Sequence, residues 1–336
     1  MSAAVQIADA SILIVAFNSR DYWPRLRAAL EAQSVQPREI FVLDNGSKPG
    51  HALTPEDMPA HIQLEVSADN LGFAGGNNRL AAKAETEWLV LLNPDAFPDA
   101  SWLEELMAAA QRHPHADLFG STQRADGADG VLDGAGDVYH ITGFPYRGGY
   151  GRKMATPEEG EIFAPCGAAM MIRRSVFEAL GGFDEDYFCY VEDVDLGARA
   201  RLAGHIAIHA KRAVVSHVGY GSSARRSDFA TYHGTRNRWW TYLKVMPLPL
   251  LILTFPLHLG LTMLLWASSA RFGQFGLFSK AQRDAFAGWG QMMTKRRQVQ
   301  RSRKVSAAQF AAMLAMNPLS LFTRAPHVRP VDGGGA

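Results

Sequence analysis

Cysteine is scarce in this sequence of 336 residues, which contains only Cys166 and Cys189. Neither has another cysteine or a histidine nearby at the spacing of metal ligands, and two residues cannot build a disulfide framework. A disulfide-stabilised secreted fold and a cysteine-based zinc module are therefore excluded. We expect the protein to work in a reducing compartment.

The sequence also lacks a strong net charge, because 34 basic residues are balanced by 33 acidic ones and leave +1. No excess of positive charge is available to attract nucleic acid, so we expect no nucleic-acid partner. The first twenty residues have no basic start followed by an apolar core, and we expect no signal peptide. The charges are unevenly spread: residues 1–99 hold 7 basic and 13 acidic residues, whereas residues 271–336 hold 11 and 2.

Apolar residues make up 47% of the chain, which is enough for a large buried core. Short apolar runs predict strands at 11–17, 39–43, 62–66 and 87–92. Helices are predicted between them, at 21–33 and in a segment that ends near residue 84. This alternation of strand and helix predicts a parallel sheet with helical crossovers.

Residues 121–160 interrupt the alternation with repeated Asp-Gly and Gly-Gly pairs, which predict loops and short strands. The regular pattern then returns, with a strand predicted at 164–172 and helices at 174–180 and 191–203. The sequence has no internal repeat.

Polar residues follow the predicted strands at the points where these strands end. Asp44, Asn70 and Asp95 each occupy such a position. Any one of them is explained as well by the preference of Asp and Asn for turns. As a set they predict a ligand site, because the carboxyl ends of parallel strands meet at one edge of the sheet.

Residues 69–78 form a glycine-rich segment that opens a helix, without the spacing of a dinucleotide-binding fingerprint. Free backbone N–H groups and the helix dipole favour an anion such as a diphosphate there. Pro94 stiffens the turn that presents Asp95, and a carboxylate beside a diphosphate suits Mg²⁺ or Mn²⁺. The alternative for Asp95 is a helix cap near Ser101, although Asp99 is better placed for that.

Glu192, Asp193 and Asp195 lie close together after an aromatic segment that includes Tyr187. One interpretation is that the two aspartates cap the helix at 195–203. The other is that a carboxylate in an aromatic pocket accepts a proton from a hydroxyl. His217 follows a further apolar strand, and it is either structural or a metal ligand together with Asp95.

Residues 245–270 contain no Asp, Glu, Lys or Arg, and residues 271–304 contain nine basic residues. The apolar run is long enough to cross a bilayer. We expect three prolines, at 247, 249 and 256, to interrupt its helix. A hairpin or re-entrant segment on anionic lipid, a single span and a buried helical subdomain are the alternatives, with Trp239, Trp240 and Trp266 at the interface in the first.

Five ordered motifs resemble a known family. They are Ser-Ile-Leu-Ile-Val-Ala-Phe-Asn-Ser, Val-Leu-Asp-Asn-Gly-Ser, Asp-Asn-Leu-Gly-Phe-Ala-Gly-Gly-Asn-Asn, Leu-Leu-Asn-Pro-Asp-Ala and Gly-Gly-Phe-Asp-Glu followed by Glu-Asp-Val-Asp-Leu. Together they resemble the family 2 glycosyltransferases, in the bacterial rhamnosyltransferase-like branch, over residues 10 to about 240. The resemblance implies an α/β fold of the GT-A type (Rossmann-like, with a mostly parallel sheet flanked by helices) and inverting transfer from a nucleotide-diphosphate sugar.

The resemblance also implies roles for individual residues. Donor contacts are implied for Ala16, Phe17, Asp44 (at the nucleobase), Asn70, Gly72, Gly75, Gly76, Asn77 and Asn93. It further implies that Asp193 is the catalytic base, that Asp95 and His217 bind Mg²⁺ or Mn²⁺, and that Glu192, Tyr187 and Gly167 lie on the acceptor side. Asn93 departs from the carboxylate pair of the motif, which leaves open how strictly a metal is required. Arg225, Arg226 and Arg236 are weaker candidates for phosphate contacts.

We therefore expect a catalytic domain over residues 1–240 and an apolar, then basic, helical membrane-associating region with a flexible tail over 241–336. The expected partners are a nucleotide-diphosphate sugar (dTDP-rhamnose first), a lipid-linked or polysaccharide acceptor and an anionic membrane surface, at the cytoplasmic face of the inner membrane. The alternatives are a nucleotidyltransferase acting on sugar phosphates and an inactive sugar- or lipid-binding scaffold.

Overall fold

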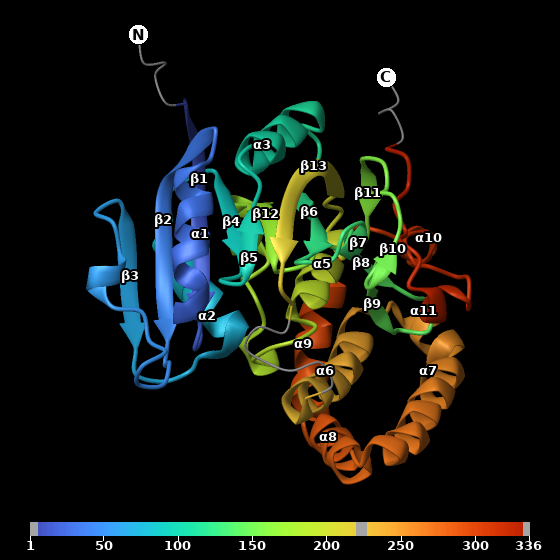
Figure 1. Ribbon diagram of the computed structural model, residues 1–336. Coiled ribbons are helices and arrows are strands. Elements are labelled where there is room, and N and C mark those ends of the chain that lie inside the picture. The colour runs from blue at the N-terminus through green and yellow to red at the C-terminus, as the bar shows by residue number, and fades with distance from the viewer. Residues whose placement is uncertain (1–5, 220–226, 332–336) are drawn as a thin grey trace.

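The computed structural model describes residues 6–219 and 227–331, in which one large twisted sheet is covered by helices (Figure 1). The predicted strands β1 (Gln6–Ala16), β2 (Val35–Asn45), β3 (Ile62–Ser67) and β4 (Trp88–Leu92) are parallel, in the order β4-β1-β2-β3. Ile40 of β2 lies opposite Ile12 of β1 and Ile62 of β3. The parallel part of the sheet is thus confirmed.

Among the described residues the large sheet has eleven strands, because later segments extend it beyond β4. These additions are β5 (Ala96–Pro98), β6 (Leu118–Ala125), β7 (Val131–Gly134), β10 (Arg152–Lys153), β11 (Gly160–Ile162), β12 (Ala169–Arg173) and β13 (Ala207–His217). β12 joins antiparallel to β4, and β13 runs parallel to β6. β8 (Asp137–Tyr139) and β9 (Pro145–Arg147) form a separate hairpin. The region of Asp-Gly pairs therefore folds into short strands and loops, as predicted.

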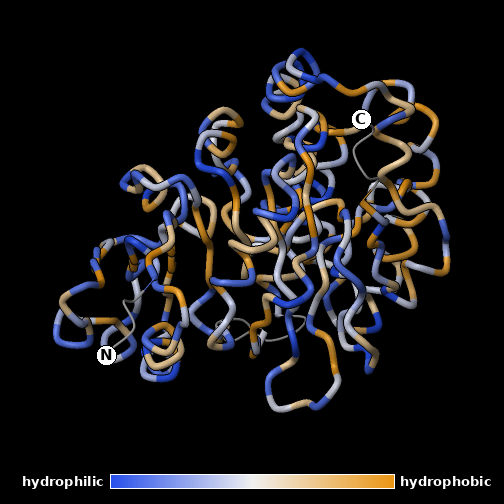
Figure 2. The backbone as a smooth tube through the Cα atoms, turned by 90° about the horizontal axis from the view of Figure 1, so that it is seen from above, coloured by the Kyte–Doolittle hydropathy of each residue, from blue (hydrophilic) through white to orange (hydrophobic). Residues whose placement is uncertain are grey.

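Alternation along the strands divides the core between two helical layers. On one face, Ile12 and Ile14 pack with α1 (Trp23–Glu31) and α3 (Trp102–Arg112). On the other face, Leu13 packs with α2 (Gly72–Ala81), α4 (Arg174–Ala179) and α5 (Glu192–Leu202). Figure 2 shows the hydrophobic stretches that run through the interior between these layers. The two layers leave the carboxyl ends of the parallel strands as an open edge.

The remaining helices form a second group beside the sheet (Figure 1). They are α6 (Asp228–Val245), α7 (Leu248–Ser269), α8 (Phe275–Ala287), α9 (Trp289–Arg301), α10 (Ala307–Ala312) and α11 (Ser320–Thr323). Residue 240 lies inside α6, which packs on α5 as well as on α8 and α9. The last described segment returns to the sheet, where Arg329 and Glu161 exchange backbone hydrogen bonds of 2.8 and 2.7 Å. A division of the chain at residue 240 stays a prediction, and the expected flexible tail falls partly on residues 332–336, outside the described ones.

Helix α7 has its polar side buried and its apolar side exposed. Thr254, His258 and Thr262 lie at spacings of four residues and are at most 2% exposed, whereas Leu253 and Leu264 are 73% and 68% exposed. Leu248–Phe272 is the single helix among the described residues that is long and apolar enough to cross a membrane. An exposed apolar surface of this kind is typical of a contact with a membrane or with another protein.

Two expectations about this region are wrong. The prolines do not break the helix, because Pro247 and Pro249 stand at its start, where the missing N–H has no helical partner, and the helix continues through Pro256. Trp239 and Trp240 do not lie at an outer surface, since both are buried, with indole N–H groups that donate to Gln282 and to the Ala285 carbonyl of α8.

Candidate active site

The main cleft of the molecule, with a volume of about 790 Å³, lies at the carboxyl ends of the parallel strands. Residues that follow β1, β2, β3 and β4 line it, together with parts of 137–150, residues 188–194 and the end of β13. Nine of the predicted site residues line this cleft: Phe17, Asn70, Gly72, Asn93, Asp95, Gly167, Glu192, Asp193 and His217. Two of the three residues predicted to meet at this edge, Asn70 and Asp95, thus lie in one cleft, and Asp44 does not.

Six predicted residues do not line the cleft: Ala16, Asp44, Gly75, Gly76, Asn77 and Tyr187. The carboxylate of Asp44 is buried and accepts hydrogen bonds from the backbone of the following loop, at Ser47 (3.1 Å) and Leu53 (2.8 Å). Gly76 lets α2 lie against β1, because a Cβ atom there would stand 2.7 Å from a methyl group of Val15. Asp44 thus holds the loop that follows β2 and Gly76 allows close packing, and the ligand contacts expected of the six residues stay predictions.

The start of α2 reaches the cleft through Gly72. Its φ of +72° is unfavourable for other residues, and an added Cβ would lie 2.3 Å from the Phe188 carbonyl oxygen. The expectation of free N–H groups at this helix start is wrong at two positions. The Gly72 N–H donates to Asn70 Oδ1 (2.8 Å), and the Ala74 N–H donates to the Phe188 carbonyl (3.2 Å).

Asp95 and His217 meet at the inner end of the cleft, where both are nearly buried. Nε2 of His217 lies 3.3 Å from Oδ1 of Asp95, and Nδ1 of His217 lies 2.7 Å from Oδ2 of Asp133. Burial lowers the pKa of His217, but the hydrogen bond to Asp133 and the negative charge of the neighbouring Asp95 outweigh burial and raise it to about 9. Asp133 itself was not predicted from the sequence.

These residues fit a divalent cation. A carboxylate oxygen and an imidazole nitrogen face each other in the cleft, and Nε2 of His217 makes no hydrogen bond of normal geometry. Asp133 on the opposite ring nitrogen is the partner that orients a metal-binding histidine. Because imidazole binds a metal in its neutral form, loading of the site would release a proton.

Asp193 lies in the first turn of α5 and lines the same cleft. Its Oδ2 accepts from the Gly167 N–H at 2.9 Å, and its Oδ1 accepts from the Val194 N–H at 2.8 Å. The neighbouring Glu192 is buried, and burial together with the charge of Asp193 raises the pKa of its carboxyl well above its usual range. Asp193 is thus the accessible one of two adjacent acids.

The capping interpretation of this acidic segment is wrong, because α5 begins at Glu192 without a side-chain cap. Asp195 is fully buried and pairs with Arg199 and Lys244, both at 2.8 Å. Tyr187 is also fully buried, and its hydroxyl donates to Asp195 at 3.1 Å. The aromatic wall of the cleft consists instead of the neighbours of Tyr187 in the same aromatic segment, Phe188 and Tyr190.

A further cluster, which includes Asp193, was not predicted from the sequence. Asp137, Cys166 and Asp193 each present a ligand atom, and these three atoms lie within 4.8 Å of one another. Burial, followed by the charge of Asp193, raises the pKa of Asp137 well above its usual range, and burial also raises the pKa of Cys166. A carboxyl and a thiol that keep their protons favour hydrogen bonding to Asp193 over metal binding. The recurrent Asp-Gly pairs pointed to this region but not to its place in the fold.

Arg225 and Arg226 lie outside the described residues. Arg236 does not line the cleft, since its guanidinium donates to the carbonyl oxygens of Asp186 (2.9 Å) and Tyr187 (3.1 Å).

Comparison with known proteins gives a family match over residues 11–181, to the family described as Glycosyl transferase family 2. The "N-acetylglucosaminyl-diphospho-decaprenol L-rhamnosyltransferase" of Mycobacterium tuberculosis is 27% identical over 263 residues, which cover 68% of this chain and 85% of that protein. The "O-antigen chain rhamnosyltransferase RfbN" of Salmonella typhimurium is 23% identical, over 67% of this chain and 70% of the relative. The resemblance to the rhamnosyltransferase-like branch is therefore confirmed.

Two solved structures share the fold. GalNAc-T7 with UDP, GalNAc and Mn²⁺ matches with a TM-score of 0.54 and 16% identity, over 70% of this chain and 47% of that one. The mannosyltransferase PcManGT from Pyrobaculum calidifontis, with GDP-Man and Mn²⁺, matches with a TM-score of 0.51 and 15% identity, over 90% and 89%. These likenesses confirm the predicted GT-A fold.

Replacing Asp137 by asparagine tests whether this buried carboxyl keeps its proton. With a raised pKa in the folded chain, Asp137 binds a proton that the unfolded chain releases above a pH of about 4. The free energy of unfolding then falls as the pH rises between the two pKa values, by up to about 1.4 kcal/mol per pH unit. Thermal unfolding between pH 5 and pH 8 should show that Asp137→Asn gains stability over the wild type as the pH rises.

The exposed Asp129, in the same region, provides the control, since Asp129→Asn should follow the wild type at every pH. A difference between Asp137→Asn and the wild type that is constant from pH 5 to pH 8 would contradict the protonated state.

Proposed function

The chain belongs to glycosyl transferase family 2, and we propose that it moves a sugar from a nucleotide-diphosphate donor, dTDP-rhamnose first, to a hydroxyl of a lipid-linked or polysaccharide acceptor. One observation carries this proposal. A carboxylate–imidazole pair, Asp95 and His217, and an accessible carboxylate, Asp193, line the same cleft at the edge of the sheet. A transfer reaction needs a group that stabilises the charge of the leaving group and a base that accepts the proton of the attacking hydroxyl.

The donor sugar and the acceptor are supported by the relatives. Two of them carry names that specify rhamnosyl transfer, and one of these names specifies N-acetylglucosaminyl-diphospho-decaprenol. A polyprenol-linked acceptor of this class agrees with a chain that exposes the apolar side of α7. Synthesis of a cell-surface glycan is the process in which such a reaction takes place.

On the acceptor side, Asp193 acts as the general base. The N–H groups of Gly167 and Val194 hold its carboxylate in place, and the attacking hydroxyl transfers its proton to this group. The acceptor oxygen bonds to C1 of the sugar from the face opposite the nucleotide, and the bond between C1 and the diphosphate breaks. The configuration at C1 is inverted by this single displacement.

On the donor side, Asp95 and His217 would hold a divalent ion, Mg²⁺ or Mn²⁺, which when bound neutralises charge on the departing diphosphate. Asp133 keeps the imidazole in the required orientation through Nδ1. Asn93 is the neutral residue of the motif and lines the cleft beside this pair.

We also propose that the helical region attaches the protein to the cytoplasmic face of the inner membrane. The attachment is peripheral or re-entrant, and no helix clearly spans the bilayer in this proposal. The exposed side of α7 meets the apolar part of the bilayer, and the exposed basic residues that follow it before α9, Arg271, Lys280 and Arg283, meet anionic head groups. Nucleotide sugars are cytoplasmic, so this orientation brings donor and lipid-linked acceptor to the same cleft.

Asp193→Asn should reduce transfer by about 10²–10⁴-fold, because one general base contributes that much to a rate. Donor binding should change little, since Asp193 acts on the acceptor. The assay uses dTDP-rhamnose and N-acetylglucosaminyl-diphospho-decaprenol with detection of dTDP. More than about a tenth of the wild-type rate in the variant would show that Asp193 is not the base, and release of pyrophosphate by the wild type would indicate a nucleotidyltransferase.

Asp95→Ala should weaken donor binding and remove the response to divalent metal. Thermal shift with a panel of nucleotide sugars, each with and without Mn²⁺, measures both effects. A wild-type enzyme that is equally active in excess chelator would overturn the metal role of Asp95 and His217.

Leu253→Asp should reduce sedimentation of the full chain with anionic vesicles, because it places a charge on the exposed side of α7. Leu319→Asp is the matched control: Leu319 is 65% exposed and lies outside α7, so binding should stay at the wild-type level. A wild-type chain that stays in solution at low salt without detergent, and does not sediment with vesicles, would defeat the membrane proposal.

A further inference from the structure

The segment between the glycine pair 181–182 and the base adopts an unusual backbone. We call residues 184–191 the acceptor-side loop. Three of its residues, Phe188, Tyr190 and Val191, have positive φ angles of 64°, 70° and 71° although none is glycine. Such conformations are costly and persist only where the surroundings fix them. All three residues line the cleft, immediately before Asp193.

Helix α6 fixes the middle of this loop. The side-chain amide of Asn237 donates to the carbonyl oxygens of Tyr187 (2.9 Å), Cys189 (2.9 Å) and Tyr190 (2.8 Å). Asn237 is fully buried, so water could not take over its hydrogen bonds to these carbonyl groups if the side chain were removed. The loop is therefore anchored to α6 at the residues with the strained backbone.

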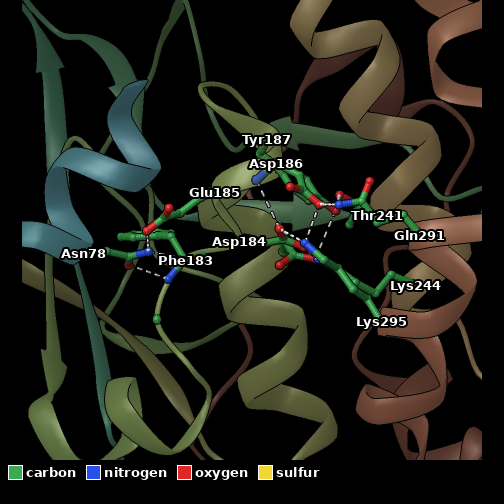
Figure 3. A network of polar contacts seen from close by, with 12 residues as sticks. Asn78, Phe183, Asp184, Glu185, Asp186, Tyr187, Thr241, Lys244, Gln291 and Lys295 are labelled. Carbon is green, nitrogen blue, oxygen red and sulfur yellow. Dashed lines mark hydrogen bonds and ion pairs between the residues drawn. The ribbon is translucent and has the colours of Figure 1, made fainter. Parts of the chain in front are cut away.

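Helix α9 fixes the beginning of the loop, as Figure 3 shows. The ammonium group of Lys295 pairs with Asp184 and, at 2.5 Å, with Asp186. Gln291, one turn earlier on α9, donates to the same carboxylate of Asp186 at 2.6 Å. Asp186 is thus held from α9 by two side chains that lie more than 100 residues away in the sequence.

A second lysine, Lys244, also pairs with Asp184, and it belongs to the buried core, whereas Lys295 does not. Lys244 is 1% exposed and bridges Asp184 (2.5 Å) and Asp195 (2.8 Å). Loss of Lys295 leaves this buried bridge intact, so the fold should persist. Asp186 and the loop that follows it would lose their ion-pair contact with α9.

We propose that Lys295 is a positioning residue for the acceptor: it holds the acceptor-side loop in the shape that places Phe188 and Tyr190 against the incoming acceptor. The proposal rests on the proposed function, in which this wall faces the attacking hydroxyl. It makes α9, which lies outside the family match at 11–181, a part of the active site as well as of the helical region.

The test compares Lys295→Met with Arg297→Met in the full chain. Arg297 lies on the same helix and is exposed, so both variants remove one charge from α9. With dTDP-rhamnose and N-acetylglucosaminyl-diphospho-decaprenol, Lys295→Met should raise the acceptor KM or lower kcat by about tenfold or more, because small misplacements at a site have large effects on rate. Donor affinity, measured by calorimetry, should change less than about twofold, and Lys295→Arg should restore most of the activity.

Amide hydrogen exchange supplies a readout that does not depend on turnover. Lys295→Met should speed exchange within residues 184–191 while the core strands keep wild-type rates, and Arg297→Met should change neither. Equal kinetics in the two Met variants, or unchanged exchange in the loop, would overturn the proposal. Absence of transfer in the wild type would contradict the proposed function, and exchange would still decide whether Lys295 holds the loop.

Discussion

One buried carboxylate joins the two sides of the cleft. Oδ2 of Asp133 accepts a hydrogen bond from Nδ1 of His217 at 2.7 Å and pairs with Arg147. His217 belongs to the proposed donor side, whereas Arg147 interacts electrostatically with the acids Asp137 and Asp193 on the proposed acceptor side. A buried charge of this kind is stable only while its partners are present. The donor and acceptor sides are therefore held in a fixed relation by residues of the irregular region between β6 and β12.

The sequence predicted what depends on local pattern. Apolar runs located the parallel strands, and the rule that ligands bind at their carboxyl ends brought together Asn70 and Asp95, which line one cleft, whereas Asp44, the third residue of that set, holds the loop after β2. Asp133 and Asp137 could not be found in this way. Their positions depend on turns and short strands whose pairing is set by distant residues, and Asp-Gly pairs specify a turn without saying what it will face.

Some residues predicted at the site belong to types with two physical uses. Gly76 suits a phosphate loop, but it also suits close packing of a helix on a sheet, and the second use holds here. Tyr187 was expected at the acceptor, yet its hydroxyl bonds Asp195 in the core. The contact of Lys295 with Asp184 and Asp186 spans more than 100 residues, so no local pattern revealed that α9 contacts the segment before Asp193. These outcomes depend on tertiary packing, which single-residue motifs do not encode.

In the proposed mechanism the enzyme breaks the bond between C1 of the sugar and the diphosphate oxygen. A donor labelled with oxygen-18 at that bridging atom tests this directly. We expect mass spectrometry to find the label entirely in the released nucleoside diphosphate, while the glycan product carries the acceptor's own oxygen. Label retained in the sugar of the product would contradict it, because the bond broken would then be the one between oxygen and phosphorus.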